Sequence, residues 1–264
     1  MTWLLDNSRT VLSLLGSHVV QAGVAVLAAF VIAVPLAHLA ARRGWLRGVV
    51  ETGSGLMYAI PSLPLLVVLP LVLGTGLRSV VNVVVALTIY GLALMVPQAC
   101  AAFRSVDRQV LDSATAVGYG SRALFARVEL PLAGPALLGG LRVVSMSTIA
   151  LVTIGGVLGV PSLGMLFVDG FQRGILAEIL SGLVLTVLLA LAADAALVGL
   201  GRVLMPWTRT SRKGRHAHGH VGRPTAPHQP GVSRQPGQLD QLAVPDQPAP
   251  PEQSGRSTHP GVRA

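Results

Sequence analysis

The sequence predicts an all-α protein that crosses a membrane several times. Hydrophobic residues make up 52% of its 264 residues, charged residues only 12%, and the mean hydropathy is +0.64. A soluble domain usually carries about 25% charged residues. The apolar residues also gather into long runs, and a helix needs about 20 such residues to cross a bilayer. Together these observations predict a polytopic membrane protein with five transmembrane helices.

The first transmembrane helix is predicted at 19–41. Residues 1–18 before it are short and mildly amphipathic, and their charges, Asp6 and Arg9, do not supply the basic start of a secretory signal. We therefore expect an external N-terminal segment followed by a retained first span. Three arginines follow this span in the manner of a stop-transfer signal: Arg42, Arg43 and Arg47.

The second span, predicted at 49–73, contains two prolines in the motif Pro61-Ser62-Leu63-Pro64. Prolines this close together interrupt the helical hydrogen-bond ladder. A membrane tolerates such a break only where protein covers it or where it lines a wet cavity. The break is either a packing kink or part of a translocation path. We favour the path, with these candidate lining residues: Pro61, Ser62, Pro64 and, from the third span, Tyr90.

Three further spans are predicted at 79–103, 133–158 and 178–205. Between the last two, residues 159–174 are too irregular for a span and rather apolar for a loop, which favours a short external helix or a partly re-entrant segment. Cytoplasmic loops are enriched in Lys and Arg. We expect the N-terminus outside and the C-terminus in the cytoplasm, because this orientation leaves only three arginines on the outer side: Arg9, Arg78 and Arg173.

The composition changes sharply after Trp207. Residues 208–264 are rich in Pro, Gln, Gly, His and Arg and lack apolar periodicity, which predicts a disordered cytoplasmic tail. Alternating histidines in this tail could hold a divalent metal weakly, but we favour flexible residues and expect no metal site: His216, His218 and His220. The net charge of +9 comes from basic residues that flank the spans or lie in the tail, so we expect no nucleic-acid partner.

The sequence of the loop at 104–132, between the third and fourth spans, predicts two short amphipathic helices separated by a break at Gly118. Glycine permits a turn there that a residue with a β-carbon resists. Ser121 is placed to cap the second helix, and Pro131 is placed to end it. The apolar residues expected to share one face of the first helix are Val110, Leu111, Ala114 and Val117. We interpret such an element between membrane spans as a surface that binds another protein.

This loop resembles the EAA loop of bacterial ABC-importer permeases, in which Glu-Ala-Ala is followed by Gly and then by Ile-x-Leu-Pro. The matching residues are Asp112, Ser113, Ala114, Gly118, Val128, Leu130 and Pro131, with Asp and Ser in place of the family's Glu and first Ala. In that family the loop forms the coupling helix, which docks into a groove of the partner ATPase. The resemblance implies a multi-pass subunit of the bacterial plasma (inner) membrane, with separate ATP-binding subunits as partners.

The resemblance extends over about residues 15–207. Further segments resemble the group of permeases that imports the compatible solutes glycine betaine, choline, carnitine or proline: 60–63, 128–133 with 140–142, 159–164 and 191–194. It implies a second permease subunit, identical or homologous, and an external solute-binding protein. Permeases for methionine, phosphonate or sulfonates share the fold and much of the loop, so another small solute is the alternative. A secondary transporter or a channel is a less favoured alternative.

No catalytic signature is found. The only lysine, Lys213, is followed by Gly214 rather than by Ser or Thr, so the chain has no Walker A phosphate loop. We expect a transport subunit that is not an enzyme, with no catalytic residues and no cofactor. By the resemblance, ATP is used by the partner ATPase.

Two charged residues lie inside predicted spans, Arg142 in the fourth and Asp194 in the fifth. A charge within a membrane is costly unless it is paired or wet. Counted from the cytoplasmic ends of their spans, both lie roughly 13–17 Å deep, which favours an ion pair between the spans. The alternatives are a proton or cation relay and an Asp194 that faces a wet cavity. His38, near the inner end of the first span, is interpreted as an interfacial residue.

Overall fold

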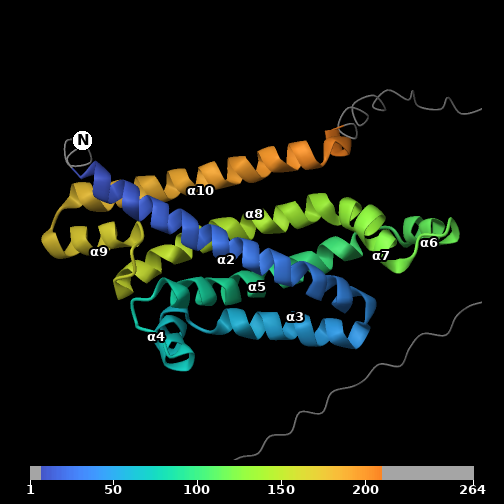
Figure 1. Ribbon diagram of the computed structural model, residues 1–264, viewed down its shortest axis with the longest axis horizontal. Coiled ribbons are helices and arrows are strands. Elements are labelled where there is room, and N and C mark those ends of the chain that lie inside the picture. The colour runs from blue at the N-terminus through green and yellow to red at the C-terminus, as the bar shows by residue number, and fades with distance from the viewer. Residues whose placement is uncertain (1–6, 210–264) are drawn as a thin grey trace, which may run out of the picture. The chain divides into compact units, whose positions relative to one another are not determined.

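The structure is a computed structural model that describes residues 7–209, and these residues fold as helices without a strand (Figure 1). The helices and short turns are α2 Ser8–Arg42, α3 Gly44–Ala59, α4 Ser62–Leu73, α5 Val80–Arg104, α6 Arg108–Ala116, α7 Ser121–Leu124, η1 Phe125–Glu129, α8 Leu130–Gly155, η2 Gly156–Leu158, α9 Gly164–Arg173, α10 Leu176–Leu204 and η3 Pro206–Arg209. The predicted all-α class is confirmed. The predicted tail at 208–264 lies almost wholly outside the described residues.

Four helical segments within the described range are long and apolar enough to cross a membrane: α2, α5, the stretch Ser121–Leu158 that contains α8, and α10. A fifth crossing exists if α3 and α4, which meet at an angle of 100°, form one bent span. The five predicted spans therefore correspond to four long helices and one broken pair.

The first helix is longer than predicted. α2 begins at Ser8, so the residues expected as a separate external segment, 1–18, join the first span from position 8 onward. The reason lies in a buried stripe that runs along the whole helix at intervals of three to four residues and includes Val11, Leu14 and His18. At about 1.5 Å per residue, a helix of 35 residues also exceeds the hydrocarbon thickness of a bilayer, so its ends extend beyond the membrane core.

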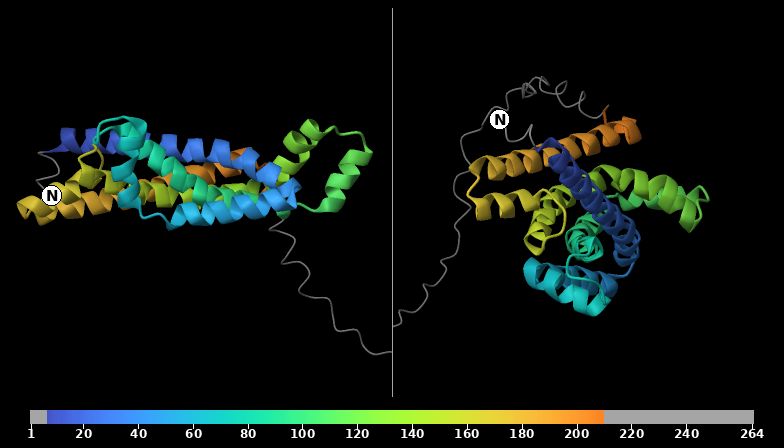
Figure 2. Two further views of the ribbon diagram at one scale, coloured as in Figure 1. Left: turned by 90° about the horizontal axis from the view of Figure 1, so that it is seen from below. Right: turned by 60° about the vertical axis from the view of Figure 1, so that its left-hand side comes forward.

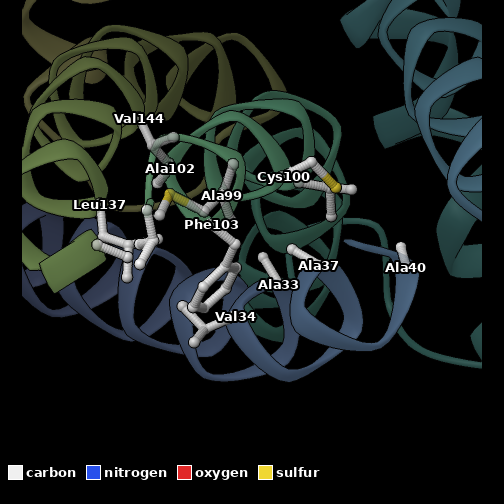
Figure 3. Packing of buried hydrophobic residues seen from close by; sticks show 14 residues of the cluster. Ala33, Val34, Ala37, Ala40, Ala99, Cys100, Ala102, Phe103, Leu137 and Val144 are labelled. Atoms are coloured by element: carbon white, nitrogen blue, oxygen red, sulfur yellow. The ribbon is translucent and has the colours of Figure 1, made fainter. Parts of the chain in front are cut away.

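The centre of the bundle is α5, which packs between α2 and α8. Small side chains make this contact close, since a β-carbon on Gly91 would lie 2.7 Å from the β-carbon of Ala29. Figure 3 shows one of the core clusters, to which both helices contribute small residues beside Phe103 of α5: Ala33, Ala37 and Ala40 from α2, and Ala99, Cys100 and Ala102 from α5. Small residues are typical of helix contacts in membranes, where close backbone approach replaces the hydrophobic effect as the driving force.

The second predicted span is interrupted at Ile60 and Pro61. Both residues have extended backbone, with ψ of 124° and 136°. α4 then begins at Ser62, and only Pro61 marks the break. Pro64 does not contribute to the break, because Pro64 lies in the first turn of α4. Backbone N–H groups in the first turn have no helical acceptor, so the N–H that proline lacks is not needed there.

The loop between α5 and α8 folds as α6, a turn at Gly118, α7 and η1, and both short helices extend past the end of the long ones (Figure 2, left). Two local expectations were wrong. Gly120, not Ser121, is the N-cap of α7. Pro131 does not end the second helix, because the chain passes through the π-helical turn η1 directly into α8, with Pro131 in the first turn of α8. A proline is tolerated there because the π turn changes the hydrogen-bond register just before it.

The segment between the fourth and fifth spans contains the short helix α9, which packs against α10 (Figure 1). The start of α9 is packed closely against the backbone of α8, since a β-carbon on Gly164 would lie 2.0 Å from the carbonyl oxygen of Thr153. Gly174 then ends α9 with a left-handed backbone, φ +67°. A short helix was one of the two forms expected here.

Candidate functional site

The turn between α6 and α7 depends on Gly118. Its φ is +101°, a left-handed conformation that side-chain-bearing residues rarely adopt. The turn is closed by backbone hydrogen bonds from Gly118 N–H to the Thr115 carbonyl at 2.9 Å and from Tyr119 N–H to the Ala114 carbonyl at 3.2 Å. No neighbouring heavy atom lies within 4 Å of a β-carbon built at this position, so the glycine is required by backbone conformation and not by space.

The first helix of the loop leaves its surface open. No residue of α6 is buried. Of the predicted apolar face, Leu111 and Ala114 are half-buried, whereas Val110 and Val117 are 44% and 80% exposed. Asp112 and Ser113 are exposed, and the Ser113 hydroxyl donates to the Gln109 carbonyl at 2.7 Å. An apolar face that the chain itself does not cover is typical of a protein-protein contact.

The second half of the loop turns inward. Its apolar residues Leu124, Phe125 and Val128 are half-buried. Leu130 and Pro131 are also half-buried. The seven residues that match the EAA pattern therefore fall into two parts, a mostly exposed one on α6 and the turn after it, and a half-buried one on η1 and at the start of α8.

A cluster of ionisable residues at this end of the bundle was not predicted. Glu129, the last residue of η1, is 6% exposed. Its carboxylate oxygens lie 3.3 Å from Nδ1 of His38 and 3.6 Å from a guanidinium nitrogen of Arg42, both on α2. His38 was expected to be merely interfacial. The sequence did signal that His38 needs a partner, because it is an ionisable residue in an apolar run. It did not show which partner, because Glu129 is far away in the sequence.

The helix break between α3 and α4 is adjacent to two tyrosines. The Tyr90 hydroxyl donates to the carbonyl of Ile60, a group that the break leaves without a helical partner. Tyr58 packs edge-on against Tyr90, with ring centroids 6.5 Å apart. Tyr90 is 5% exposed, whereas Tyr58 is 56% exposed. The structure thus brings Tyr90 to the break, where Pro61 and Pro64 are exposed and Ser62 is half-buried.

Arg142 of α8 and Asp194 of α10 meet across the two helices. The Nε and Nη2 atoms of the arginine donate to the two carboxylate oxygens at 2.5 and 2.7 Å, which is a bidentate pair. The Arg142 side chain is 41% exposed and the Asp194 side chain 18%. Both partners lie well inside helices that are long enough to cross a membrane.

Two further observations bear on ligand or metal binding by the described residues. A cavity of about 560 Å³ between α2, α8 and α10 is lined by apolar side chains with Ser145 as the one polar side chain. Within residues 7–209 no three potential metal ligands gather. The tail residues Lys213, His216, His218 and His220 lie outside the described residues.

Comparison with known proteins agrees with this architecture. The permease protein OpuBD of a Bacillus subtilis choline transport system is 30% identical over 217 residues, which cover 82% of this chain and 95% of the relative. OpuCD of the B. subtilis glycine betaine/carnitine/choline system is 32% identical over 206 residues, covering 78% and 89%. The osmoprotectant import permease protein OsmW of Salmonella typhimurium is 30% identical over 207 residues, covering 77% and 96%.

Solved structures show the same fold. A structure of the inward-facing MetNI methionine ABC transporter has a TM-score of 0.67 at 20% identity and covers 75% of this chain and 98% of its own. A structure of an amino acid ABC transporter has a TM-score of 0.63 at 16% identity and covers 76% and 97%. Finally, residues 23–210 match the family model "Binding-protein-dependent transport system inner membrane component". The chain therefore belongs to the family of inner membrane components of binding-protein-dependent transport systems, as a permease subunit of the ABC-importer type.

Proposed function

We propose that the chain is the membrane-spanning subunit of an ATP-driven importer for compatible solutes such as choline, glycine betaine, carnitine or proline. The observation that carries the proposal is the exposed helix–Gly118–helix element in a chain whose relatives are named as choline, carnitine and osmoprotectant permeases. The open face of α6 would dock on a separate ATP-binding subunit, which would use the ATP. The chain itself would hold no cofactor and catalyse no reaction.

The complex would contain two permease subunits, identical or homologous, two ATP-binding subunits and an external solute-binding protein. The N-terminus would lie outside and the C-terminus in the cytoplasm, which puts the loop α6–α7 on the side where ATP is available. The charge distribution supports this orientation, since the loop carries four arginines around the EAA-like stretch: Arg104, Arg108, Arg122 and Arg127.

The translocation path would run along the break between α3 and α4. Residues 55–61 are exposed in the single chain, and this stretch includes backbone that is not helical. Non-helical backbone at membrane depth has to be covered by protein or line a wet cavity, because lipid offers no hydrogen-bond partners. The second permease subunit would provide that cover. Pro61, Ser62, Pro64 and Tyr90 would then line or support the path between the two subunits.

ATP dependence tests the class of transporter. The chain, its ATP-binding subunit and its binding protein are reconstituted into proteoliposomes, and labelled solute is counted. We expect uptake only with internal ATP and with the binding protein outside, because the chain has no Walker A phosphate loop with which to use ATP by itself. Uptake driven by an ion gradient in vesicles that contain this chain alone would contradict the proposal and identify a secondary transporter.

Ligand binding by the cognate solute-binding protein tests the substrate. We expect saturable calorimetric binding of choline, glycine betaine, carnitine or proline, and competition among those that bind. Methionine and a sulfonate serve as the comparison ligands, since permeases of other groups share the fold. Tight binding of either, with no heat from the compatible solutes, would show that the importer carries another class of substrate. It would leave the proposed class of transporter unchanged.

A further inference from the structure

The loop α6–α7 is held to the bundle at few places. Neither α6 nor α7 contains a buried residue. A cavity of about 500 Å³ lies between this loop and the ends of α2 and α5, with Arg42, Phe103, Leu111 and Leu124 among its lining residues. The first well-buried residue after α7 is Glu129, which also lines this cavity. Glu129 is therefore the point at which the loop becomes fixed to the membrane-spanning helices.

The π-helical turn η1 directs two of its residues toward α2. Leu130 N–H bonds to the carbonyl of Phe125, five residues back, which is the wide spacing of a π helix. The Phe125 ring lies 4.1 Å from the ring of His38 between centroids, and Phe103 of α5 closes the group edge-on at 5.5 Å. At the other end of the turn, the Glu129 carboxylate reaches the same histidine. Both ends of η1 thus contact one residue of α2.

The ionic contacts keep this turn beside α2. Oε1 of Glu129 lies 3.3 Å from Nδ1 of His38, without the alignment of a hydrogen bond, and Oε2 lies 3.6 Å from the guanidinium of Arg42. The Glu129 side chain is 8% exposed and that of Arg42 is 43% exposed. A buried carboxylate that leaves its basic partners stays uncompensated, which is strongly unfavourable. Any movement that carries η1 away from α2 is opposed for this reason.

We propose that Glu129, together with His38 and Arg42, forms a clasp that passes movement of the loop α6–α7 to α2. The chain itself connects the loop to α5 and to α8, whereas α2 is joined to the loop only through space. α2 packs along α5, so a displacement of its end reaches the centre of the bundle. Glu129 is then a positioning residue for coupling. This inference rests on the proposed function, since it requires an ATP-binding subunit that moves the loop.

Replacing Glu129 by glutamine tests the clasp, because it removes the charge and keeps the size. In the reconstituted complex, we expect Glu129→Gln to lower the number of solute molecules moved per ATP by at least about fivefold, the lower end of ordinary coupling between two sites. The ATP-binding subunit should still copurify. Arg42→Gln should act in the same direction, and the double variant should lose less than the product of the two single losses.

The matched control is Glu51→Gln. Glu51 pairs with Arg47 at 3.0 Å within α3, an ion pair of the same chemistry that joins no two elements. It should leave the transport ratio unchanged. A wild-type ratio in Glu129→Gln, or strictly multiplicative losses in the double variant, would overturn the clasp. If Glu129→Gln does not accumulate, Arg42→Gln decides alone, since its nearly half-exposed side chain makes misfolding a lesser concern.

A distance measurement reads the clasp directly. Spin labels at Leu39 of α2 and Ser121 of α7 replace two exposed residues, and neither lies on the open face of α6. We expect one narrow distance distribution in the wild-type complex, with and without ATP, and a broad one in Glu129→Gln. Equally narrow distributions in both would overturn the inference. Failure of the wild-type chain to bind an ATP-binding subunit would instead remove the proposed function, and with it this inference.

Discussion

Replacing Gly118 by valine is expected to abolish most ATP-driven uptake while leaving the protein in the membrane. The φ of +101° at this position costs a β-branched residue on the order of 1–3 kcal/mol. The turn sits outside the helical core, so this strain is relieved by moving α6 relative to α7 and not by unfolding the bundle. The docking face of α6 would then meet the ATP-binding subunit in the wrong orientation. When both are measured on the same vesicles, ATP hydrolysis should continue while solute uptake falls.

The matched control is Gly120→Val, two residues further along the same turn. Gly120 also has no neighbour within 4 Å of a built β-carbon, but its φ is −69° and its ψ 159°, a conformation that valine adopts freely. Gly120→Val should therefore transport normally. Normal uptake by Gly118→Val would show that the left-handed turn is not needed for coupling, and equal losses in both variants would assign the effect to bulk at the docking surface.

The membrane-spanning helices were predictable because hydrophobicity over about 20 residues is a local property of the chain. α5 and α10 lie within about two residues of their predicted bounds, at Val80–Arg104 and Leu176–Leu204. The interruption at Pro61 was also predictable, since proline acts on its own helix. The 100° angle between α3 and α4 was not, because it depends on what packs beside the break, including Tyr90.

Contacts that depend on two distant segments were the ones that sequence reasoning missed. His38 and Glu129 each have a simple interpretation alone, as an interfacial histidine and as the variable residue of a Val-Glu-Leu-Pro motif. Only the packing of η1 against α2 brings them together. The early start of α2 was missed for a similar reason, since the stripe of Val11, Leu14 and His18 is covered by the distant segment 163–166 at the start of α9. Pro131 was misjudged because the π turn before it could not be foreseen.

Breaking the pair between Arg142 and Asp194 is expected to reduce the amount of folded permease severalfold. The two hydrogen bonds of 2.5 and 2.7 Å are made between helices at membrane depth, where the loss of one partner leaves a charge that neither lipid nor a helix backbone compensates. Arg142→Ala and Asp194→Ala should each lower membrane abundance, and the double variant should recover part of the loss. Detergent-soluble, monodisperse protein per cell measures this quantity.

A proton or cation relay at Asp194 makes a different prediction. Asp194→Asn would then keep the fold and abolish transport, without rescue by any change at Arg142. A pair predicts instead that abundance and uptake fall together in the single variants and recover together in the double variant, since the remaining folded protein is competent. The bidentate geometry favours the pair, because both carboxylate oxygens are engaged by the guanidinium and neither is directed elsewhere. Strictly additive abundance losses would show that the two side chains do not interact, and the stabilising pair would then be dropped.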